Sequence, residues 1–399
     1  MKKITNIITI SLFIFLLIAF VFIGIIMPKD EQSGIDENRT LKGMPVLTKE
    51  SLFSGNFSRE FEDYLADNVG MRSKFTSLSS KINGLKGIKT NLGKIVSVKK
   101  DLGAGGDSDD TAKLLVQGNR IMEIYKSYPA GEINYAKAIN KYADEFSEKA
   151  NVYSMLIPTQ IEFSGNIYKS TSDSQRDAID SIYVKLNDSV KKVDVYDLMM
   201  ENMGDYIYFR TDHHWTQRGA YLGYKAFVEM AGEKPVSLSS LKLNRADGFF
   251  GFLYNQANDT SLSDKPDYME WFEGNENYIV KASTMEDGNI VSYDSRIYVA
   301  PENAPKYSVF MGGDHSFAEI NTNVKNGKTV LVIKDSYANA LIPFLTNNYS
   351  TVLAVDPRSY YGKVSELVDR YGVDDILIMN YIFTPTFDDF IEKIDEICK

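Results

Sequence analysis

Cysteine is almost absent from this chain of 399 residues, and histidine and tryptophan are scarce. The only cysteine is Cys398, one residue from the end. A single cysteine excludes an internal disulfide and a metal site built from several thiolates, so the fold must rely on its apolar core. Because the chain has only three histidines, acid–base chemistry by histidine is confined to a few positions.

Basic charge is also in short supply. Lys and Arg number 44 against 54 Asp and Glu, which gives a net charge of −10 and a pI near 5.1. Nucleic-acid binding needs a basic face whose counterion release supplies affinity, so we exclude that class of function. The 44% share of hydrophobic residues and 25% of charged residues are ordinary for a folded protein, so disorder is not expected.

One long apolar run is present at the N-terminus. Lys2 and Lys3 precede an uncharged stretch of 24 residues from Ile4 to Met27, and roughly 20 are enough to cross a membrane. A cleaved signal peptide, the alternative, has a shorter apolar region and a small-residue cleavage site, which the sequence after Met27 does not provide. We expect residues 1–28 to be a single-pass anchor in the cell membrane, with a cytoplasmic N-terminus and an extracytoplasmic remainder.

The segment over residues 29–110 predicts an extracytoplasmic stalk with a helical part. Leu52, Phe57, Phe61 and Leu65 recur there at helical spacing. A stretch rich in Gly, Asp and Ser follows at residues 99–110 and indicates a surface loop or a domain boundary. We expect the main domain over residues 111–399.

Helical and strand patterns alternate in that domain. Strands are expected at 152–157, 193–196, 329–333, 351–355 and 375–379, and helices at 133–150, 172–190, 338–345 and 364–371. Such alternation is typical of a parallel α/β sheet, whose active site gathers at the carboxyl ends of the strands. Between about 232 and 328 the helical signal fades, and we expect a β-rich insertion. Four aromatic residues of this region can either stack on sugars or belong to the hydrophobic core: Phe252, Tyr254, Trp271 and Phe272.

Two of the three histidines lie in the stretch from Thr211 to Ala220. In an extended segment Asp212 and His214 share one face, and His213 points elsewhere. Asp212 would then hold the His214 ring in one tautomer and stabilise its protonated form, as in a hydrolase triad.

Two other interpretations of the histidine pair stay open. The pair can be structural, at the start of a helix that Thr216 caps. It can also join Asp212 and His315 in a metal site, although adjacent histidines seldom ligate one ion from a regular element. We expect no metal and no cofactor. His315, which follows two glycines and an acid, either lines the substrate cleft or is an ordinary surface or buried histidine.

A serine follows the expected strand at 329–333. Ser336 comes after Asp335 at a strand-to-helix turn, where a hydroxyl is exposed and can act as a nucleophile. Asn380, at the end of a neighbouring strand, can donate to the oxyanion that forms during acyl transfer. A plain turn at Ser336 and a capping role for Asn380 are the structural alternatives.

The stretch from Thr211 to Ala220 resembles the motif that names the bacterial DHHW family, which is similar to the SGNH-like O-acetylating proteins of alginate and other exopolysaccharide systems. The stretches 36–41, 311–315, 334–339 and 343–345 resemble that family too, so the resemblance covers nearly the whole chain. It implies an SGNH-hydrolase-like, circularly permuted parallel sheet with the Asp-x-His element ahead of the serine.

Residue by residue, the resemblance implies Ser336 as the nucleophile, His214 as the base and Asp212 as its orienting acid. The chain departs from the SGNH pattern at Lys334, where glycine is usual, and at Tyr381, where an acid is usual. Six residues are candidates for the oxyanion site or for substrate contact: Asn380, Tyr337, Tyr381, His315, Asp335 and Arg358.

The expected function is therefore O-acetyl transfer to a cell-surface polysaccharide through an acyl-serine intermediate. The resemblance implies a polytopic membrane acyltransferase as the partner that supplies the acetyl groups. A carbohydrate acetyl-esterase of the same fold remains an alternative, because the sequence does not show whether water or a sugar hydroxyl is held in line for attack. An inactive polysaccharide-binding scaffold of an exopolysaccharide machine is the second alternative.

Overall fold

The structure is a computed structural model of the chain. It describes residues 13, 15, 43–68, 93–99, 111–165, 171–257, 262, 265–275, 277–286, 289–301 and 306–399. The chain divides into one compact unit of residues 1–90 and 258–264 and a second of residues 91–257 and 265–399. The expected anchor lies almost entirely outside the described residues. Within the described ranges, no helix is long and apolar enough to cross a membrane.

The described part of the first unit is helical. It contains α3 (Lys49–Phe53) and α4 (Asn56–Asn68). The rings of Phe57 and Phe61, one turn apart on α4, stack with centroids 5.7 Å apart. The helix predicted from the spacing of the apolar residues is therefore present.

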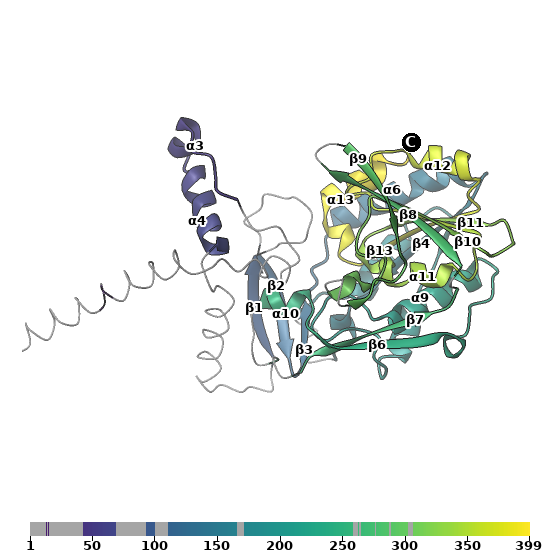
Figure 1. Cartoon of the computed structure of the whole chain (residues 1–399), viewed down its shortest axis with the longest axis horizontal. Helices are drawn as coiled ribbons and strands as arrows, with labels where there is room; N and C mark the ends of the chain where they lie inside the picture. Colours follow the sequence, from purple (N-terminus) through teal and green to yellow (C-terminus); the bar gives the residue numbers. More distant parts are fainter. Residues whose placement is uncertain are drawn as a thin grey trace, which may run out of the picture. The chain divides into compact units, whose positions relative to one another are not determined.

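An eight-stranded sheet forms the centre of the second unit (Figure 1), with strand order β5-β4-β13-β11-β12-β10-β8-β9. The strands are β4 (Asn151–Ile157), β5 (Val190–Lys192), β8 (Tyr278–Glu286), β9 (Asn289–Ser295), β10 (Phe317–Thr322), β11 (Thr329–Lys334), β12 (Thr351–Val355) and β13 (Asp375–Tyr381). The strands from β5 to β12 run parallel, whereas β10, β8 and β9 continue the sheet in antiparallel fashion. The sheet is therefore mixed and not parallel throughout, which corrects the prediction.

The β-rich character expected for residues 232–328 is present, but most of these strands are not a separate insertion. Strands β8, β9 and β10 extend the central sheet, because β10 pairs with β12. Among the strands described in this region, β6 (Lys242–Phe249) and β7 (Asp267–Glu273) alone form a two-stranded sheet of their own.

A three-stranded sheet precedes the central one in sequence. It consists of β1 (Lys94–Lys99), β2 (Thr111–Gln117) and β3 (Arg120–Glu123). Strands β1 and β2 pair with each other from either side of residues 100–110. The second compact unit thus begins at Asn91, ahead of the boundary expected near residue 110.

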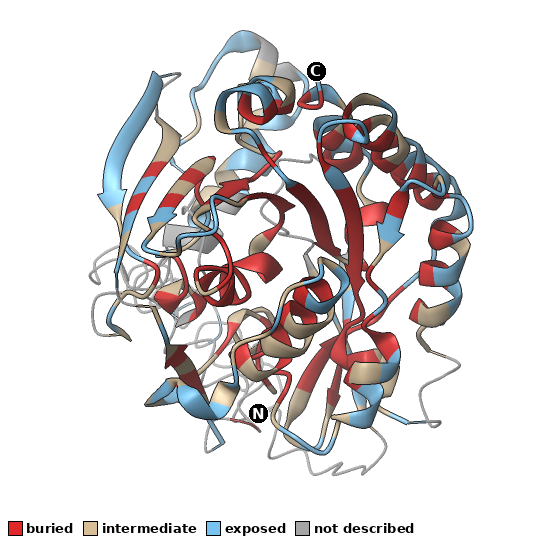
Figure 2. Cartoon of the chain, turned by 90° about the vertical axis from the view of Figure 1, so that its right-hand side faces the viewer, coloured by how far each residue is buried: buried red, intermediate tan, exposed pale blue. Residues whose placement is uncertain are grey.

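Helices cover both faces of the central sheet, because alternate residues of its buried strands point to opposite sides. On β11, Leu331 and Ile333 belong to the core under α6 (Pro129–Phe146), α7 (Gln175–Tyr183), α12 (Val364–Tyr371) and α13 (Asp388–Glu396). Val330 and Val332 belong to the core under α8 (Tyr196–Glu201), α9 (Gln217–Met230), η7 (Ser336–Ala340) and α11 (Ile342–Leu345). Figure 2 shows the buried strands between these layers. The remaining short helices are η1 (Gln160–Phe163), η3 (Leu238–Ser240), α10 (Phe252–Ala257), η6 (Lys306–Val309) and η8 (Thr384–Thr386).

Strand β12 and helix α12 have the bounds that the sequence predicts, but the strand predicted at 193–196 is wrong. The strand in that region is β5, which ends at Lys192, and Tyr196 begins α8. The Asp194 carboxylate accepts a hydrogen bond of 2.9 Å from the backbone N–H of Tyr196. Such a local side-chain contact turns the chain instead of continuing an extended strand.

Candidate active site

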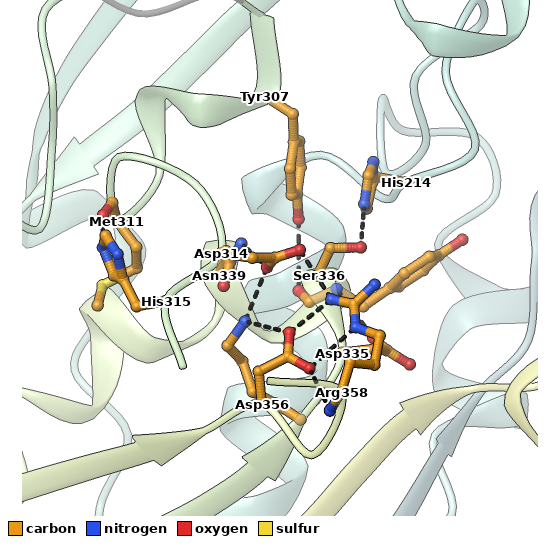
Figure 3. Close-up of polar contacts among 12 residues, drawn as sticks. His214, Tyr307, Met311, Asp314, His315, Asp335, Ser336, Asn339, Asp356 and Arg358 are labelled. Atoms are coloured by element: carbon orange, nitrogen blue, oxygen red, sulfur yellow. Dashed lines mark hydrogen bonds and ion pairs between the residues drawn. The ribbon is translucent and has the colours of Figure 1, made fainter. Parts of the chain in front are cut away.

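Ser336, His214 and Asp212 form a hydrogen-bonded row just beyond the carboxyl end of β11. The Nε2 atom of His214 lies 2.8 Å from the Oγ of Ser336, a contact drawn in Figure 3. The Nδ1 atom of His214 lies 2.6 Å from the Oδ1 of Asp212. Asp212 and His214 are buried and Ser336 is half-buried. The structure thus brings together the three residues that the sequence singles out, in the order nucleophile, base and acid.

Backbone N–H groups hold Asp212 in place. Its Oδ1 accepts from the backbone N–H of His214 at 3.0 Å, and its Oδ2 accepts from that of Phe252 at 2.7 Å. A Cβ at Gly251 would lie 2.3 Å from the Cβ of Asp212, so this approach of the two chains requires glycine. Burial favours a higher pKa for Asp212, but the charge and hydrogen bond of His214 outweigh burial and hold this pKa well below its ordinary value. Asp212 is therefore ionised at neutral pH.

Asp212 and His214 meet for a different reason from the one inferred from the sequence. Residues 210–214 are a series of bends and not an extended strand. The carboxylate of Asp212 reaches the N–H two residues ahead, as in an Asx-turn. His213 does not point elsewhere, because its ring centroid lies 3.9 Å from that of His214. The contact between Asp212 and His214 is as predicted, and the orientation predicted for His213 is wrong.

Trp215 joins the histidine segment to the serine turn. Its fully buried indole donates a hydrogen bond of 2.8 Å from Nε1 to the carbonyl oxygen of Tyr337. Thr216 is the N-cap of α9, and its Oγ1 accepts from the N–H of Gly219. The capping role predicted for Thr216 is thus present alongside the contact of His214 with Ser336.

Asp335 fixes the turn that carries Ser336. Its Oδ1 accepts from the N–H of Tyr337 at 2.9 Å, and its Oδ2 accepts from the N–H of Tyr381 at 2.9 Å and from the Thr384 hydroxyl at 3.0 Å. Burial raises the pKa of Asp335, although the N–H groups of Tyr381 and Tyr337 act against that rise. Since both oxygens are engaged and buried, Asp335 is placed to position Ser336 and not to contact a substrate.

Two of the expected oxyanion candidates are engaged elsewhere. Asn380 is fully buried, and its amide contacts the Oδ2 of Asp335 at 3.3 Å and the hydroxyl of Tyr135 at 2.9 Å. The N–H of Tyr337 is taken by Asp335, and the Tyr337 hydroxyl donates to the carbonyl oxygen of His213. These contacts favour positioning roles for Asn380 and Tyr337 over the expected oxyanion role.

His315 and Arg358 also contact other parts of the protein (Figure 3). The two ring nitrogens of His315 lie 2.6 Å from the carbonyl oxygen of Met311 and 2.8 Å from the Tyr293 hydroxyl. Arg358 pairs with Asp356 through Nε at 2.9 Å and with Asp314 through a second nitrogen at 2.8 Å. His315 is buried and both of its ring nitrogens are engaged, which favours the second of the two alternatives, an ordinary buried histidine.

The unusual Lys334 belongs to the same charged network. Its side chain is only 3% exposed, and its Nζ lies 2.8 Å from Asp314 and 3.6 Å from Asp356. A buried ammonium is tolerated only when it is paired in this way. The departure from the SGNH pattern at this position is thus compensated by two carboxylates beneath the serine turn.

Tyr307 is a site residue that the sequence analysis misses. Its ring stacks on the imidazole of His214, with centroids 3.7 Å apart and planes 8° apart. Its hydroxyl donates to the carbonyl oxygen of Tyr337 at 3.3 Å. Tyr307 comes from η6, far from His214 in sequence, and no local pattern distinguishes it among 25 tyrosines.

Asp212, His213 and His214 also lie close enough to be considered as metal ligands. One ligand atom from each falls within 4.8 Å of the others. Both ring nitrogens of His214 are, however, engaged by Asp212 and Ser336, and the Nδ1 of His213 lies 3.9 Å from Asp212. A metal ion would have to break the contact between His214 and Asp212. These side chains therefore fit the hydrogen-bonded row better than they fit a metal site.

The aromatic residues proposed as sugar platforms are divided between core and site. Phe272 is buried in the core and Trp271 donates to Glu273. Phe252 is half-buried and packs edge-on against His213, with centroids 5.5 Å apart.

A cavity of about 230 Å³ lies elsewhere, between β8, β10 and residues 359–362, and none of its lining residues belongs to the hydrogen-bonded row.

Comparison with known proteins identifies the family. Solved structures with the same architecture include a DHHW family protein from Eubacterium siraeum, with 28% identity, a TM-score of 0.65, and coverage of 74% of this chain and 99% of that one. Bacillus cereus PatB1 with a sulfonyl adduct has 19% identity, a TM-score of 0.59, and coverage of 72% and 99%. The O-acetyltransferase domain of Pseudomonas putida AlgJ matches with 13% identity, a TM-score of 0.39, and coverage of 71% and 98%. No curated protein matches the sequence. The DHHW protein family profile matches residues 105–355, more than half of the chain, and the protein therefore belongs to the DHHW family.

Proposed function

We propose that the protein transfers O-acetyl groups to a cell-surface polysaccharide through an acyl-serine intermediate. The observation that carries this proposal is the row from Ser336 through His214 to Asp212, with contacts of 2.8 Å and 2.6 Å. A serine within hydrogen-bond reach of a base that an acid orients is the arrangement of an activated nucleophile. The position of Asp212 and His214 ahead of Ser336 in the chain supports the circularly permuted SGNH arrangement.

In the first half-reaction, the Nε2 of His214 takes the hydroxyl proton of Ser336 while Oγ bonds to the acetyl carbonyl carbon of the donor. The resulting tetrahedral oxyanion collapses, the bond between the acyl carbon and the donor oxygen breaks, and His214 returns its proton to that oxygen. Ionised Asp212 stabilises the imidazolium that exists between these two proton transfers.

In the second half-reaction, a sugar hydroxyl gives its proton to His214 as its oxygen bonds to the acyl carbon. The bond from the acyl carbon to Oγ then breaks, and the proton returns to Ser336. Water in place of the sugar makes the same enzyme an esterase, since the chemistry differs only in the acceptor. The resemblance of the DHHW family to O-acetylating proteins of exopolysaccharide systems supports transfer.

The direct test is to incubate the full chain, purified in detergent, with an acetyl-ester donor and a panel of oligosaccharides. We expect oligosaccharides heavier by one acetyl group in the mass spectrum. Acetate release without any acetylated sugar would identify an esterase. If neither acetate nor acetylated sugar is detected, the inactive scaffold is favoured.

Replacing Tyr307 by leucine is expected to lower kcat for ester turnover about tenfold. The stacked ring stabilises the imidazolium form of His214 by a cation–π contact, and the loss of about 1–2 kcal/mol corresponds to such a change. Tyr307→Phe keeps the stacked ring and should lose less. Equal losses in the two variants, measured with p-nitrophenyl acetate, would assign the effect to the hydroxyl and not to the ring.

Metal chelation is expected to leave ester turnover unchanged, because His214 activates Ser336 without a Lewis acid. The measurement compares initial rates before and after dialysis against a chelator. A loss of rate that zinc restores would instead support a metal site at Asp212, His213 and His214.

We further propose that residues 1–28 anchor the protein in the cell membrane and that the remainder is extracytoplasmic. The uncharged run of 24 residues after Lys2 and Lys3 supports this placement. An anchor would keep Ser336 close to a polytopic membrane acyltransferase that supplies acetyl groups. We expect the full chain to stay with membranes after an alkaline wash and to be digested by protease added outside intact spheroplasts. A soluble form that begins near residues 28–35 would contradict this proposal.

A further inference from the structure

The cavity of about 230 Å³ lies within the second compact unit, and its walls come from β8, β9, β10, residues 359–362 and α12. Sites that enclose a whole drug-sized ligand measure roughly 300–1,000 Å³. This cavity therefore holds a single ring-sized group. The row at Ser336 contributes none of the lining residues, so a ligand in the cavity is bound without being acylated.

Aromatic rings and hydroxyl groups make up much of the cavity lining. The rings of Phe317 and Tyr360 contact each other with centroids 6.1 Å apart, and the side chain of Tyr361 is 69% exposed. The hydroxyl of Ser316, another lining residue, has no hydrogen-bond partner in the described part of the chain. Further hydroxyls come from Ser283, Thr284 and Ser359. A sugar unit suits such a lining, because its apolar face stacks on aromatic rings and its hydroxyls donate to and accept from side-chain hydroxyls.

Arg370 is the only charged residue among those that line the cavity. Its Cζ lies 5.1 Å from the centroid of the Tyr371 ring, whose hydroxyl donates a hydrogen bond of 2.6 Å to Glu319. The ring thus orients the guanidinium, and Glu319 is already engaged. No ion pair joins Arg370 to Glu366, one turn earlier on α12, or to any other carboxylate that the structure describes. The planar guanidinium can therefore donate to a carboxylate of a ligand, whose geometry it matches.

Backbone hydrogen bonds hold the walls of the cavity together. The N–H groups of Ser359 and Tyr360 donate to the carbonyl oxygen of Asp356 at 3.1 Å and 3.0 Å. The N–H of Asp356 in turn donates to the carbonyl oxygen of Ser316 at 3.2 Å, which fastens the segment to the start of β10. Because these walls are already formed, a ligand does not have to order them when it binds.

We propose that this cavity is a second, non-catalytic binding site for one acidic sugar unit of a polysaccharide. Arg370 pairs with the carboxylate of the unit, and the aromatic rings contact its apolar face. A polymer held at a second site stays near the enzyme between acyl transfers. The inference goes beyond the proposed function and does not depend on it, because binding in the cavity requires no acyl donor.

The test measures the binding of matched hexamers to the full chain in detergent by isothermal titration calorimetry, with no acyl donor present. The acidic probes are hexamers of galacturonic acid and of glucuronic acid, and the neutral probes are hexamers of galactose and of glucose with the same linkages. We expect at least one acidic hexamer to bind about tenfold more tightly than its neutral counterpart. Arg370→Met should raise the Kd of that acidic hexamer about tenfold, and Tyr361→Ser about fivefold. Equal binding of acidic and neutral hexamers, or no binding of any hexamer, would overturn the proposal.

A control variant separates the cavity from general attraction to positive charge. Arg370 and Tyr361 are both exposed, so their variants should keep Tm within about 2 °C of wild type. Arg296→Met is the matched control, because it removes the same charge from another exposed arginine, which does not line the cavity. Weakening by Arg296→Met as large as that by Arg370→Met would refute the site, and so would unchanged affinity in both cavity variants. Failure of the proposed function would differ, since wild type would then release no acetate from an ester although the acidic hexamer still binds.

Discussion

Ser336→Ala is expected to abolish acyl turnover and to leave the protein folded. The hydroxyl is the group that attacks the acyl carbon, and it lies 2.8 Å from the Nε2 of His214. The side chain is half-buried, and the turn around it is fixed by Asp335 and not by the serine. In triad enzymes, loss of one member leaves only the residual rate from binding and the oxyanion site, so we expect a fall of about 10³-fold or more.

Covalent labelling with a sulfonyl fluoride provides a second readout for Ser336. Wild type should carry the label on the peptide that contains Ser336, and the Ser336→Ala protein should not be labelled. Ser316→Ala is a matched control, because Ser316 is also next to a strand, one residue before β10, but lines the separate cavity. A label on Ser316, or near-wild-type turnover by Ser336→Ala, would make the turn at Ser336 a structural feature only and would assign the nucleophile to another residue.

The predictable part of the fold follows from local patterns. Strand β11 contains an unbroken apolar run from Val330 to Ile333, and all six of its residues are buried, so the run marks the central place of the strand in the sheet. The row of Ser336, His214 and Asp212 could be assembled because two of its members are neighbours in sequence and the third follows β11. These signals are short-range, and a single sequence displays them.

The sequence does not reveal contacts between distant segments when the residues that make them belong to no motif. Tyr307 reaches His214 across 93 positions, and nothing adjacent to it marks the contact. The side chain of His315 contacts the carbonyl oxygen of Met311 and the hydroxyl of Tyr293. The chain turns back on itself at Gly312 and Gly313, which both have positive φ. The direction of a side chain after such a turn depends on tertiary packing, and periodicity carries no information about it.

The position of His213 illustrates the same limit within one motif. An alternating strand would separate it from His214, whereas the bends at residues 210–214 place the two rings against each other. Proximity alone does not give both histidines the same chemistry. The Nε2 of His214 contacts Ser336 and its Nδ1 contacts Asp212, but the Nδ1 of His213 is buried and unpaired.

His214→Ala is therefore expected to lower ester turnover on the order of 10³-fold or more, and His213→Ala far less. Only His214 can take the proton of Ser336, so its loss removes the base from the reaction. Asp212→Asn should also cause a loss of roughly 10³-fold or more, because an amide can neither fix the same tautomer of His214 nor stabilise the imidazolium.

The measurement compares kcat/KM for p-nitrophenyl acetate among the three variants, with circular dichroism to show that each is folded. His213→Ala serves as the matched control, since it removes an imidazole whose ring centroid lies 3.9 Å from that of His214 without touching the contact to Ser336. If His213→Ala is the more damaging change while both proteins are folded, His213 and not His214 is the base. The row from Ser336 to Asp212 would then be a structural hydrogen-bond chain, and the mechanism proposed above would have to be abandoned.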